Sequence, residues 1–312
     1  MSAGSRSLLL IIPFTLAALW GVLHTPPPPP EPRTDDAEED VELATLPELP
    51  RWILDPLPDF HLYQDVTEKK AAFFSYLYSR TLLVNSRILL QRQHLLDLQV
   101  KETLSENDIE WLAKQAERLR VDQETGSDEM FRRLLRRLDT IPPSLVLAQA
   151  ANESAWGTSR FARQGNNLFG QWCFSPGCGL VPLSRPEGAN YEVARFRSAY
   201  HSVRAYVQNL NRHPAYHELR VLREKAHQSG GYPTGSELAA GLGDYSERGH
   251  EYIQELRSMI RYNNLVWYDQ QYRDTIVSRD NIEGLMDLAT APEERLQPGY
   301  EPAEDTNTAS VD

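Results

Sequence analysis

The sequence has few cysteines. Only Cys173 and Cys178 occur among its 312 residues. Two sulfur atoms cannot complete a tetrahedral zinc site, and no histidine flanks them at ligand spacing, so we expect no metal. In an exported protein two cysteines this close together are typical of a disulfide, and a pair of free thiols is the alternative.

The sequence also has no excess of positive charge. Its net charge is −12, so we expect no nucleic-acid partner. The acidity lies in the flanks, because residues 24–52 carry 2 basic and 8 acidic side chains and residues 271–312 carry 3 and 10. Residues 53–270 have no net charge, so the net charge does not indicate what this central part of the chain binds. Such acidic flanks are usually solvated.

Long apolar runs are scarce, and the main one lies at the N-terminus. Residues 8–23 are apolar and follow Arg6, but no small-x-small cleavage site comes after them. We interpret residues 1–23 as a signal anchor in a membrane. A cleaved signal peptide and a buried helix are the alternatives. Either export interpretation places the rest of the chain outside the cytoplasm.

The following segment is a linker. Five consecutive prolines at 26–30 favour a stiff polyproline II spacer, and acidic residues follow them. Residues 24–52 are therefore predicted to hold a domain away from a membrane.

The rest of the sequence predicts a mainly α fold without internal repeats. Apolar residues at three and four spacing indicate a helix over 67–99, and Ser105 and Ser127 are predicted N-caps of two more. We assign 53–124 to a helical extension that either packs on the next domain or recruits a partner. Residues 125–270 form the main domain, and residues 271–312 are predicted to be a disordered acidic tail.

Within the main domain, a helix should begin at Pro142–Pro143 and run to about Ala155. The Gly- and Pro-rich stretch after it predicts a loop and a small β-hairpin, with strands near 180–183 and 191–196. Helices follow from about residue 200, with a break at Pro214 and with Ser246 as the predicted cap of the last one.

Glu153 is the first candidate for chemistry. In "LAQAANESAWG" it shares a helix face with small and apolar residues and with Trp156. A carboxyl group there would be partly desolvated, which raises its pKa and suits it to donate a proton near neutral pH. A salt bridge to Arg160 or Arg163 is the structural alternative.

The loop "NNLFGQW" supplies candidate substrate contacts. Aromatic faces pack on sugar rings, and amides bind hydroxyl and N-acetyl groups. The candidates in the loop are Asn166, Asn167, Phe169 and Trp172, to which Trp156 is added. Core packing is the alternative for Phe169. Further on, Tyr245 lies in the Gly-flanked turn "GLGDYSERGHEY", where its phenol either faces a cleft or packs against the hairpin.

Together these motifs resemble a known family. "AQAANESAWGTSRFA", "NNLFG", the hairpin ending "EVARFRSAY" and "GDYSERGHEYIQEL" occur in the order seen in the glucosaminidase domain of glycoside hydrolase family seventy-three. "NLFGQWCFSPGCGLVP" is similar to the Bax-type proteins of Gram-negative bacteria. This resemblance implies that residues 8–23 anchor the chain in the inner membrane and that the rest of the chain lies in the periplasm. The resemblance covers about 125–265 and implies a lysozyme-like, α-rich fold with a small β lobe.

The resemblance also implies roles for individual residues. Glu153 matches the catalytic acid in its E-S-x-W-G context, and Tyr245 matches a tyrosine of the substrate cleft. "YSERGHEY" departs from the commoner Y-A-T-D-x-x-Y form, so the role of that Asp is not carried over. The second carboxylate belongs to the hairpin, where Glu192 is preferred to Glu187 because it lies in a predicted strand.

The implied activity is hydrolysis of peptidoglycan glycan strands after N-acetylglucosamine, without a cofactor. A disulfide between Cys173 and Cys178 would then fix the loop that follows Trp172. A lytic transglycosylase uses one Glu on a similar scaffold and is one alternative. A membrane-anchored protein that binds peptidoglycan without cleaving it is another.

Overall fold

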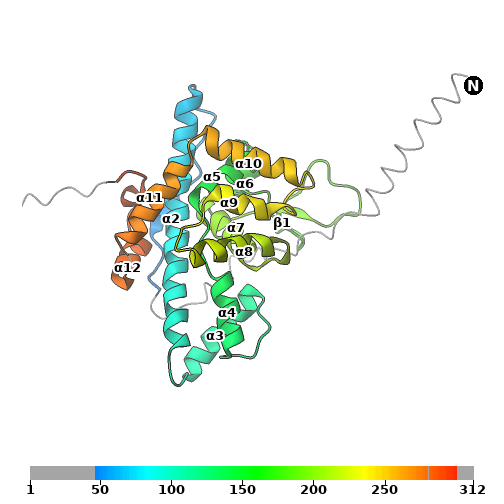
Figure 1. Cartoon of the computed structure of the whole chain (residues 1–312). Coiled ribbons are helices and arrows are strands. Elements are labelled where there is room, and N and C mark those ends of the chain that lie inside the picture. The colour runs from blue at the N-terminus through cyan, green and yellow to red at the C-terminus, as the bar shows by residue number, and fades with distance from the viewer. Residues whose placement is uncertain (1–45, 280, 301–312) are drawn as a thin grey trace, which may run out of the picture. The chain divides into compact units, whose positions relative to one another are not determined.

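The computed structural model describes residues 46–279 and 281–300. Helices dominate this part of the chain, and strands are confined to one small lobe (Figure 1). The predicted signal anchor and most of the linker fall outside the described residues. Within the described residues, none of the helices combines the length and the apolar character that crossing a membrane requires.

One long helix, α2 (Val66–Gln99), runs through the fold (Figure 1). The Asp65 side chain accepts a hydrogen bond from the Glu68 amide and so caps the first turn. Its 34 residues give a length of about 51 Å. The helix predicted over 67–99 is confirmed, and a short 3-10 helix, η1 (Arg51–Leu54), precedes it.

Two shorter helices pack on the C-terminal end of α2. α3 (Glu106–Leu119) begins with a capping box between Ser105 and Asp108. α4 (Asp128–Arg137) begins at Ser127, whose side chain accepts the Met130 amide. Both predicted caps are confirmed. The three helices share a separate apolar cluster, whose largest members are Leu95, Leu98, Trp111, Leu112, Met130, Phe131 and Leu134.

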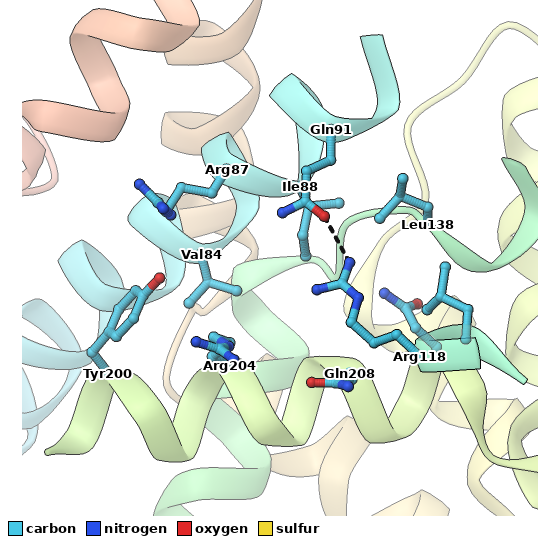
Figure 2. Close-up of a pocket in the computed structure, with 11 residues that line it drawn as sticks. Val84, Arg87, Ile88, Gln91, Arg118, Leu138, Tyr200, Arg204 and Gln208 are labelled. Atoms are coloured by element: carbon cyan, nitrogen blue, oxygen red, sulfur yellow. Dashed lines mark hydrogen bonds between the residues drawn. The ribbon is translucent and has the colours of Figure 1, made fainter. Parts of the chain in front are cut away.

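A small hollow of about 30 Å³ lies where α2, α3 and α7 (Ala199–Arg212) meet (Figure 2). Across it, Arg118 of α3 donates a 2.7 Å hydrogen bond to the Gln91 side chain of α2. This contact links the two helices at the edge of their apolar cluster.

The main core surrounds α5 (Pro143–Glu153), whose residues from Pro143 to Ala151 are all buried. Asp269 caps its first turn, because its carboxylate accepts the Ser144 amide at 2.8 Å and the Ser144 hydroxyl at 2.6 Å. The helices of this core besides α2 and α7 include α8 (His217–Gln228), α9 (Gly235–Leu238), α10 (His250–Tyr262) and α11 (Val266–Val277). The remaining short elements are α6 (Arg160–Gly165), η2 (Pro214–Tyr216) and η3 (Ala239–Leu242).

The helical extension shares this core. Phe73, Phe74 and Leu77 of α2 belong to the same buried cluster as α5 and α10. The main domain therefore covers the apolar surface of these three side chains. This is the arrangement expected of an extension that packs on the domain.

A three-stranded antiparallel sheet forms the β lobe. Its order is β1 (Trp172–Cys173), β3 (Glu192–Ala194), β2 (Gly179–Leu180), with Val193 opposite both Trp172 and Leu180. The β2–β3 pair is the predicted hairpin, and β1 adds a strand that the sequence did not predict. The expected fold class, mainly α with a small β lobe, is confirmed.

The prediction that residues 271–300 belong to a disordered tail was wrong. α11 continues to Val277, and α12 (Ile282–Thr290) and η4 (Glu293–Leu296) follow. Leu285 and Leu288 of α12 are buried against the core beside α2. A nine-residue helix has too few apolar positions for a clear periodic pattern. Residues 301–312 lie outside the described residues.

Candidate active site

Glu153 is the last residue of α5, so the helix ends two residues before the predicted position. The next turn is unusual, because Ala155, Trp156 and Gly157 all have left-handed backbones, with φ of 50°, 59° and 74°. This conformation costs about 1–2 kcal/mol at a residue with a side chain. A Cβ at Gly157 would lie 2.6 Å from the Phe60 ring, so packing against the extension also requires glycine there.

A chain of hydrogen bonds holds the Glu153 carboxyl group. The Tyr252 hydroxyl donates to Glu153 Oε1 at 2.7 Å, and Gln149 Nε2 donates to that hydroxyl oxygen at 2.9 Å. The Tyr206 hydroxyl in turn donates to Gln149 Oε1. Neither Arg160 nor Arg163 forms an ion pair with Glu153 in the part of the chain that the structure describes. The carboxyl group is therefore positioned by neutral donors rather than by a salt bridge.

The surroundings of Glu153 favour its protonated form. Burial raises the pKa of this carboxyl, while the Tyr252 hydrogen bond and the Arg248 charge oppose the shift without cancelling it. A carboxyl whose pKa is raised keeps a larger share of its protons near neutral pH than an ordinary Glu does. This is the state that a general acid requires.

Tyr245 lies beside this network. Its ring stacks on that of Tyr252, with centroids 5.5 Å apart and planes 5° apart, and its hydroxyl donates to the Phe169 carbonyl at 3.0 Å. Burial raises the pKa of Tyr245, so the phenol stays neutral. The structure thus brings Tyr245 and Glu153 together through Tyr252.

The chain leaves space next to Glu153 at Gly170. Its φ is +64°, and a Cβ there would lie 3.9 Å from Glu153 Oε2. The neighbouring Phe169 is buried, and its ring stacks on Tyr206 with centroids 4.0 Å apart. Phe169 is therefore a core residue, which was the alternative interpretation of this position.

The two predicted amide contacts bind the backbone of the β lobe. Asn167 Nδ2 donates to the carbonyls of Gln171 and Ala194 at 2.8 and 2.9 Å. Asn166 ends α6 in a left-handed conformation and donates to the Phe196 carbonyl at 3.0 Å. Both side chains hold the lobe in place, and their contact with a substrate stays a prediction.

The two predicted tryptophans differ in exposure. Trp156 is partly buried and makes edge-to-face contacts with Phe73 and Phe74 of α2. Trp172 on β1 is 37% exposed, with its ring 4.3 Å from that of Tyr191. Of the two tryptophans, Trp172 is therefore the one that presents an exposed ring, and the partly buried Tyr191 packs beside it.

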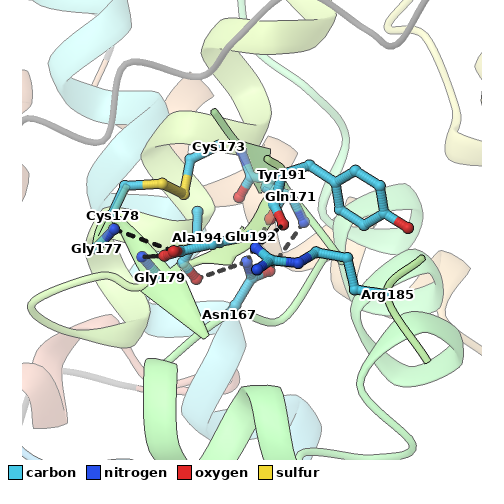
Figure 3. Close-up of a disulfide and its surroundings, with 10 residues drawn as sticks. All are labelled: Asn167, Gln171, Cys173, Gly177, Cys178, Gly179, Arg185, Tyr191, Glu192 and Ala194. Atoms are coloured by element: carbon cyan, nitrogen blue, oxygen red, sulfur yellow. Dashed lines mark hydrogen bonds between the residues drawn. A yellow bond between two sulfur atoms is a disulfide. The ribbon is translucent and has the colours of Figure 1, made fainter. Parts of the chain in front are cut away.

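Glu192 lies in the β lobe, where its side chain is bound by the neighbouring loop (Figure 3). Its two carboxylate oxygens accept the amides of Gly177 at 3.0 Å and Gly179 at 2.7 Å. These two amides, with Gly177 contributing most, lower the pKa of Glu192. Glu192 is therefore ionised at neutral pH. Glu187, the other candidate, is exposed.

The predicted disulfide between Cys173 and Cys178 is present and closes the loop that supplies these amides (Figure 3). Ligand atoms of both cysteines and of Glu192 lie within 4.8 Å of one another. Sulfur atoms bonded to each other are not thiolates, so this group does not offer the ligands that zinc requires.

Comparison with known proteins now identifies the family. Residues 128–265 match the family model named Glucosaminidase and described as mannosyl-glycoprotein endo-beta-N-acetylglucosaminidase. The chain is 34% identical to "Protein bax" of Escherichia coli (strain K12) over 208 residues, which cover 66% of this chain and 74% of that protein. The chain belongs to the Bax-type glucosaminidase-domain family. No solved structure matches it.

The glucosaminidase model spans Glu153, Glu192 and Tyr245, and also Tyr252. The domain is therefore of a glycosidase type. Sequence reasoning missed Tyr252 and Gln149 as partners of Glu153. Tyr252 is the second tyrosine of "YSERGHEY", but it follows Tyr245 by seven residues, one more than separates the tyrosines of the commoner motif, so the motif did not identify it.

Proposed function

We propose that this protein hydrolyses peptidoglycan glycan strands after N-acetylglucosamine, as an endo-β-N-acetylglucosaminidase with Glu153 as general acid. The observation that carries the proposal is the state of Glu153. Its carboxyl group is partly desolvated, its pKa is raised, and neutral donors hold it at the rigid end of α5. The match to the glucosaminidase model supports the choice of substrate.

In the first step, Glu153 donates its proton to the glycosidic oxygen, so the leaving sugar departs as an alcohol. The resulting carboxylate accepts the hydrogen bond from Tyr252, which is stronger toward a charged acceptor. The bare Gly170 backbone beside Oε2 gives the sugar room to approach. The exposed Trp172 ring, which packs beside Tyr191, provides a face for a neighbouring sugar ring.

The reaction also needs a second catalytic group, and its identity differs between two possible routes. In the first, Glu192 acts as a base on water, giving inversion, and its lowered pKa keeps it ionised as a base must be. In the second, the substrate's own acetamido group attacks the anomeric carbon and Tyr245 orients it, giving retention. In the second route the two amide hydrogen bonds to Glu192 stay unchanged during the reaction. The anomeric configuration of the first product, read by NMR, separates the routes.

The test of the function is product analysis of intact sacculi digested by the whole chain. Mass spectrometry should find fragments with reducing N-acetylglucosamine ends. Anhydromuramyl ends would instead establish a lytic transglycosylase. If no bond is cut, while the protein binds sacculi equally well with Glu153 and with Glu153→Gln, the non-catalytic binder is correct.

The predicted place of action is the periplasm, with residues 8–23 as the membrane anchor. It rests on the apolar N-terminal sequence and on the similarity to a protein of Escherichia coli. Fractionation of cells that express the whole chain should place it with the inner membrane. Deletion of residues 8–23 should then leave it in the cytoplasm, because that deletion removes the export signal as well.

A further inference from the structure

A second cavity lies away from the candidate active site. Its volume is about 300 Å³, which is at the lower end of the range for small-molecule sites. It is enclosed by α2, α11, the residues before α5 and the segment after α8. Pro142 and Pro143 line it at the start of α5, whereas Glu153 ends that helix. The 11 residues of α5 therefore separate the two places by about 16 Å.

The walls of this cavity are largely apolar. Leu89 of α2, Pro142 and Pro143 form one part, and Tyr272 and Ile276 of α11 form another. Four of these five side chains are buried, and Leu89 is partly buried. An apolar body would therefore find hydrophobic surface on both sides.

The two carboxylates in the lining already have partners. Asp139 accepts hydrogen bonds from His227 at 3.0 Å and from the Thr140 amide at 2.8 Å, and Arg223 lies within ion-pair distance. Asp269 binds Ser144 and the Gly235 amide. Neither carboxylate is left to attract a cation.

Arg273 differs from every other charged group in the lining. Its guanidinium lies over the Tyr232 ring, 5.1 Å from the centroid, and its Nε is buried without a hydrogen-bond partner. Within residues 46–279 and 281–300 it forms no ion pair. Arg92, by contrast, donates to the carbonyls of Leu135 and Leu138. Asp269 interacts electrostatically with Arg273. Among the described residues, however, no carboxylate pairs directly with the Arg273 guanidinium, so its positive charge is only partly balanced.

We propose that this cavity binds a small organic carboxylate, whose apolar body fills the space between Leu89 and Ile276 and whose carboxylate pairs with Arg273. A guanidinium presents two parallel N–H donors that match a carboxylate, and stacking on Tyr232 holds its plane. The apolar walls select against small inorganic anions, which cannot use them.

The test uses a matched pair of probes on the whole chain. N-acetyl-leucine carries the carboxylate, and N-acetyl-leucinamide has the same apolar body without the charge. Calorimetric titration should show that the carboxylate binds at least tenfold more tightly than the amide, since a hydrogen bond to a charged group is worth about that factor. Methyl NMR shifts on binding should map to Leu89 and Ile276.

Two arginine variants complete the experiment. Arg273→Gln should weaken binding of N-acetyl-leucine about tenfold or more and leave binding of the amide unchanged. Arg279→Gln is the control, because Arg279 follows α11 closely in the chain but does not line the cavity. Hydrolysis of sacculi should be unchanged in both variants. Equal binding of the two probes, no effect of Arg273→Gln, no binding at millimolar concentration, or shifts elsewhere would each overturn the proposal.

Discussion

The two glutamates of the candidate site have the same side chain in opposite surroundings. Glu153 ends a buried helix and receives its hydrogen bond from a tyrosine, and burial raises its pKa. Glu192 lies on a short strand and receives two backbone amides, which lower its pKa. Near neutral pH the first is suited to donate a proton and the second to accept one. The surroundings, rather than the residue type, divide the roles.

The largest expected effect is that of Glu153→Gln. It removes the proton donor and keeps the size of the side chain, so the rate of glycan cleavage should fall about 10²–10⁴-fold. The release of soluble fragments from sacculi measures it. Glu218→Gln, at an exposed position of α8, is the matched control and should keep the parent rate. A Glu153→Gln variant as fast as the parent would remove Glu153 from the mechanism.

Glu192→Gln should have the second-largest effect. If Glu192 is the base, the rate falls by about 10² or more, with little change in KM. Glu187→Gln is the control within the same lobe, because Glu187 is exposed. A loss with Glu187→Gln and none with Glu192→Gln would reverse the assignment. If neither variant loses activity and the product is retained, the acetamido group of the substrate is the second group.

Removal of the disulfide distinguishes a chemical role of Glu192 from a structural one. Cys173→Ser with Cys178→Ser should loosen the loop that carries the Gly177 and Gly179 amides, at a cost of roughly 2 kcal/mol or less. We expect a clear loss of glycan-cleaving activity with little change in the melting temperature. The loss of activity should be smaller than the loss caused by Glu192→Gln. If the serine variant and Glu192→Gln lose activity equally, Glu192 acts only by holding the loop. Unchanged activity would show that the loop needs no such bond.

The smallest expected effect is that of Tyr252→Phe, which should shift the pH profile of kcat/KM. The Tyr252 hydroxyl stabilises the ionised form of Glu153, so Tyr252→Phe should raise the pKa of Glu153 further. A general acid works only while protonated, so the alkaline limb of kcat/KM should move to higher pH. Tyr262→Phe, at an exposed tyrosine of the same helix, should leave the profile unchanged. A shift to lower pH would contradict the direction of this hydrogen bond.

The sequence predicted local features of the fold well. Ser105, Ser127 and Asp108 carry their capping signal within four residues, and the helix over 67–99 follows from its own periodicity. The tail assignment was wrong because α12 is short and is stabilised by contacts with α2, far away in the sequence. Likewise Gly249, not Ser246, precedes α10.

In the candidate site, too, local features were predicted and contacts between distant parts of the sequence were not. The predicted face placed Glu153 among small residues, but its partner Tyr252 comes from a helix 99 positions later, which no local pattern reports. The strand position of Glu192 was predicted, whereas its two amide donors depend on how the disulfide loop folds back. Asn167 has the residue type of a sugar ligand, and in the structure it binds the backbone of the lobe.

The comparison between the two glutamates is tested most directly by titrating both side chains. Carbon NMR of the glutamate carboxyl groups, assigned with Glu153→Gln and Glu192→Gln, follows each proton separately in the whole chain. Glu153 should titrate above the ordinary range of glutamate and Glu192 below it. If Glu153 lost its proton at or below the pH at which Glu192 does, the proposed division between acid and base would be contradicted.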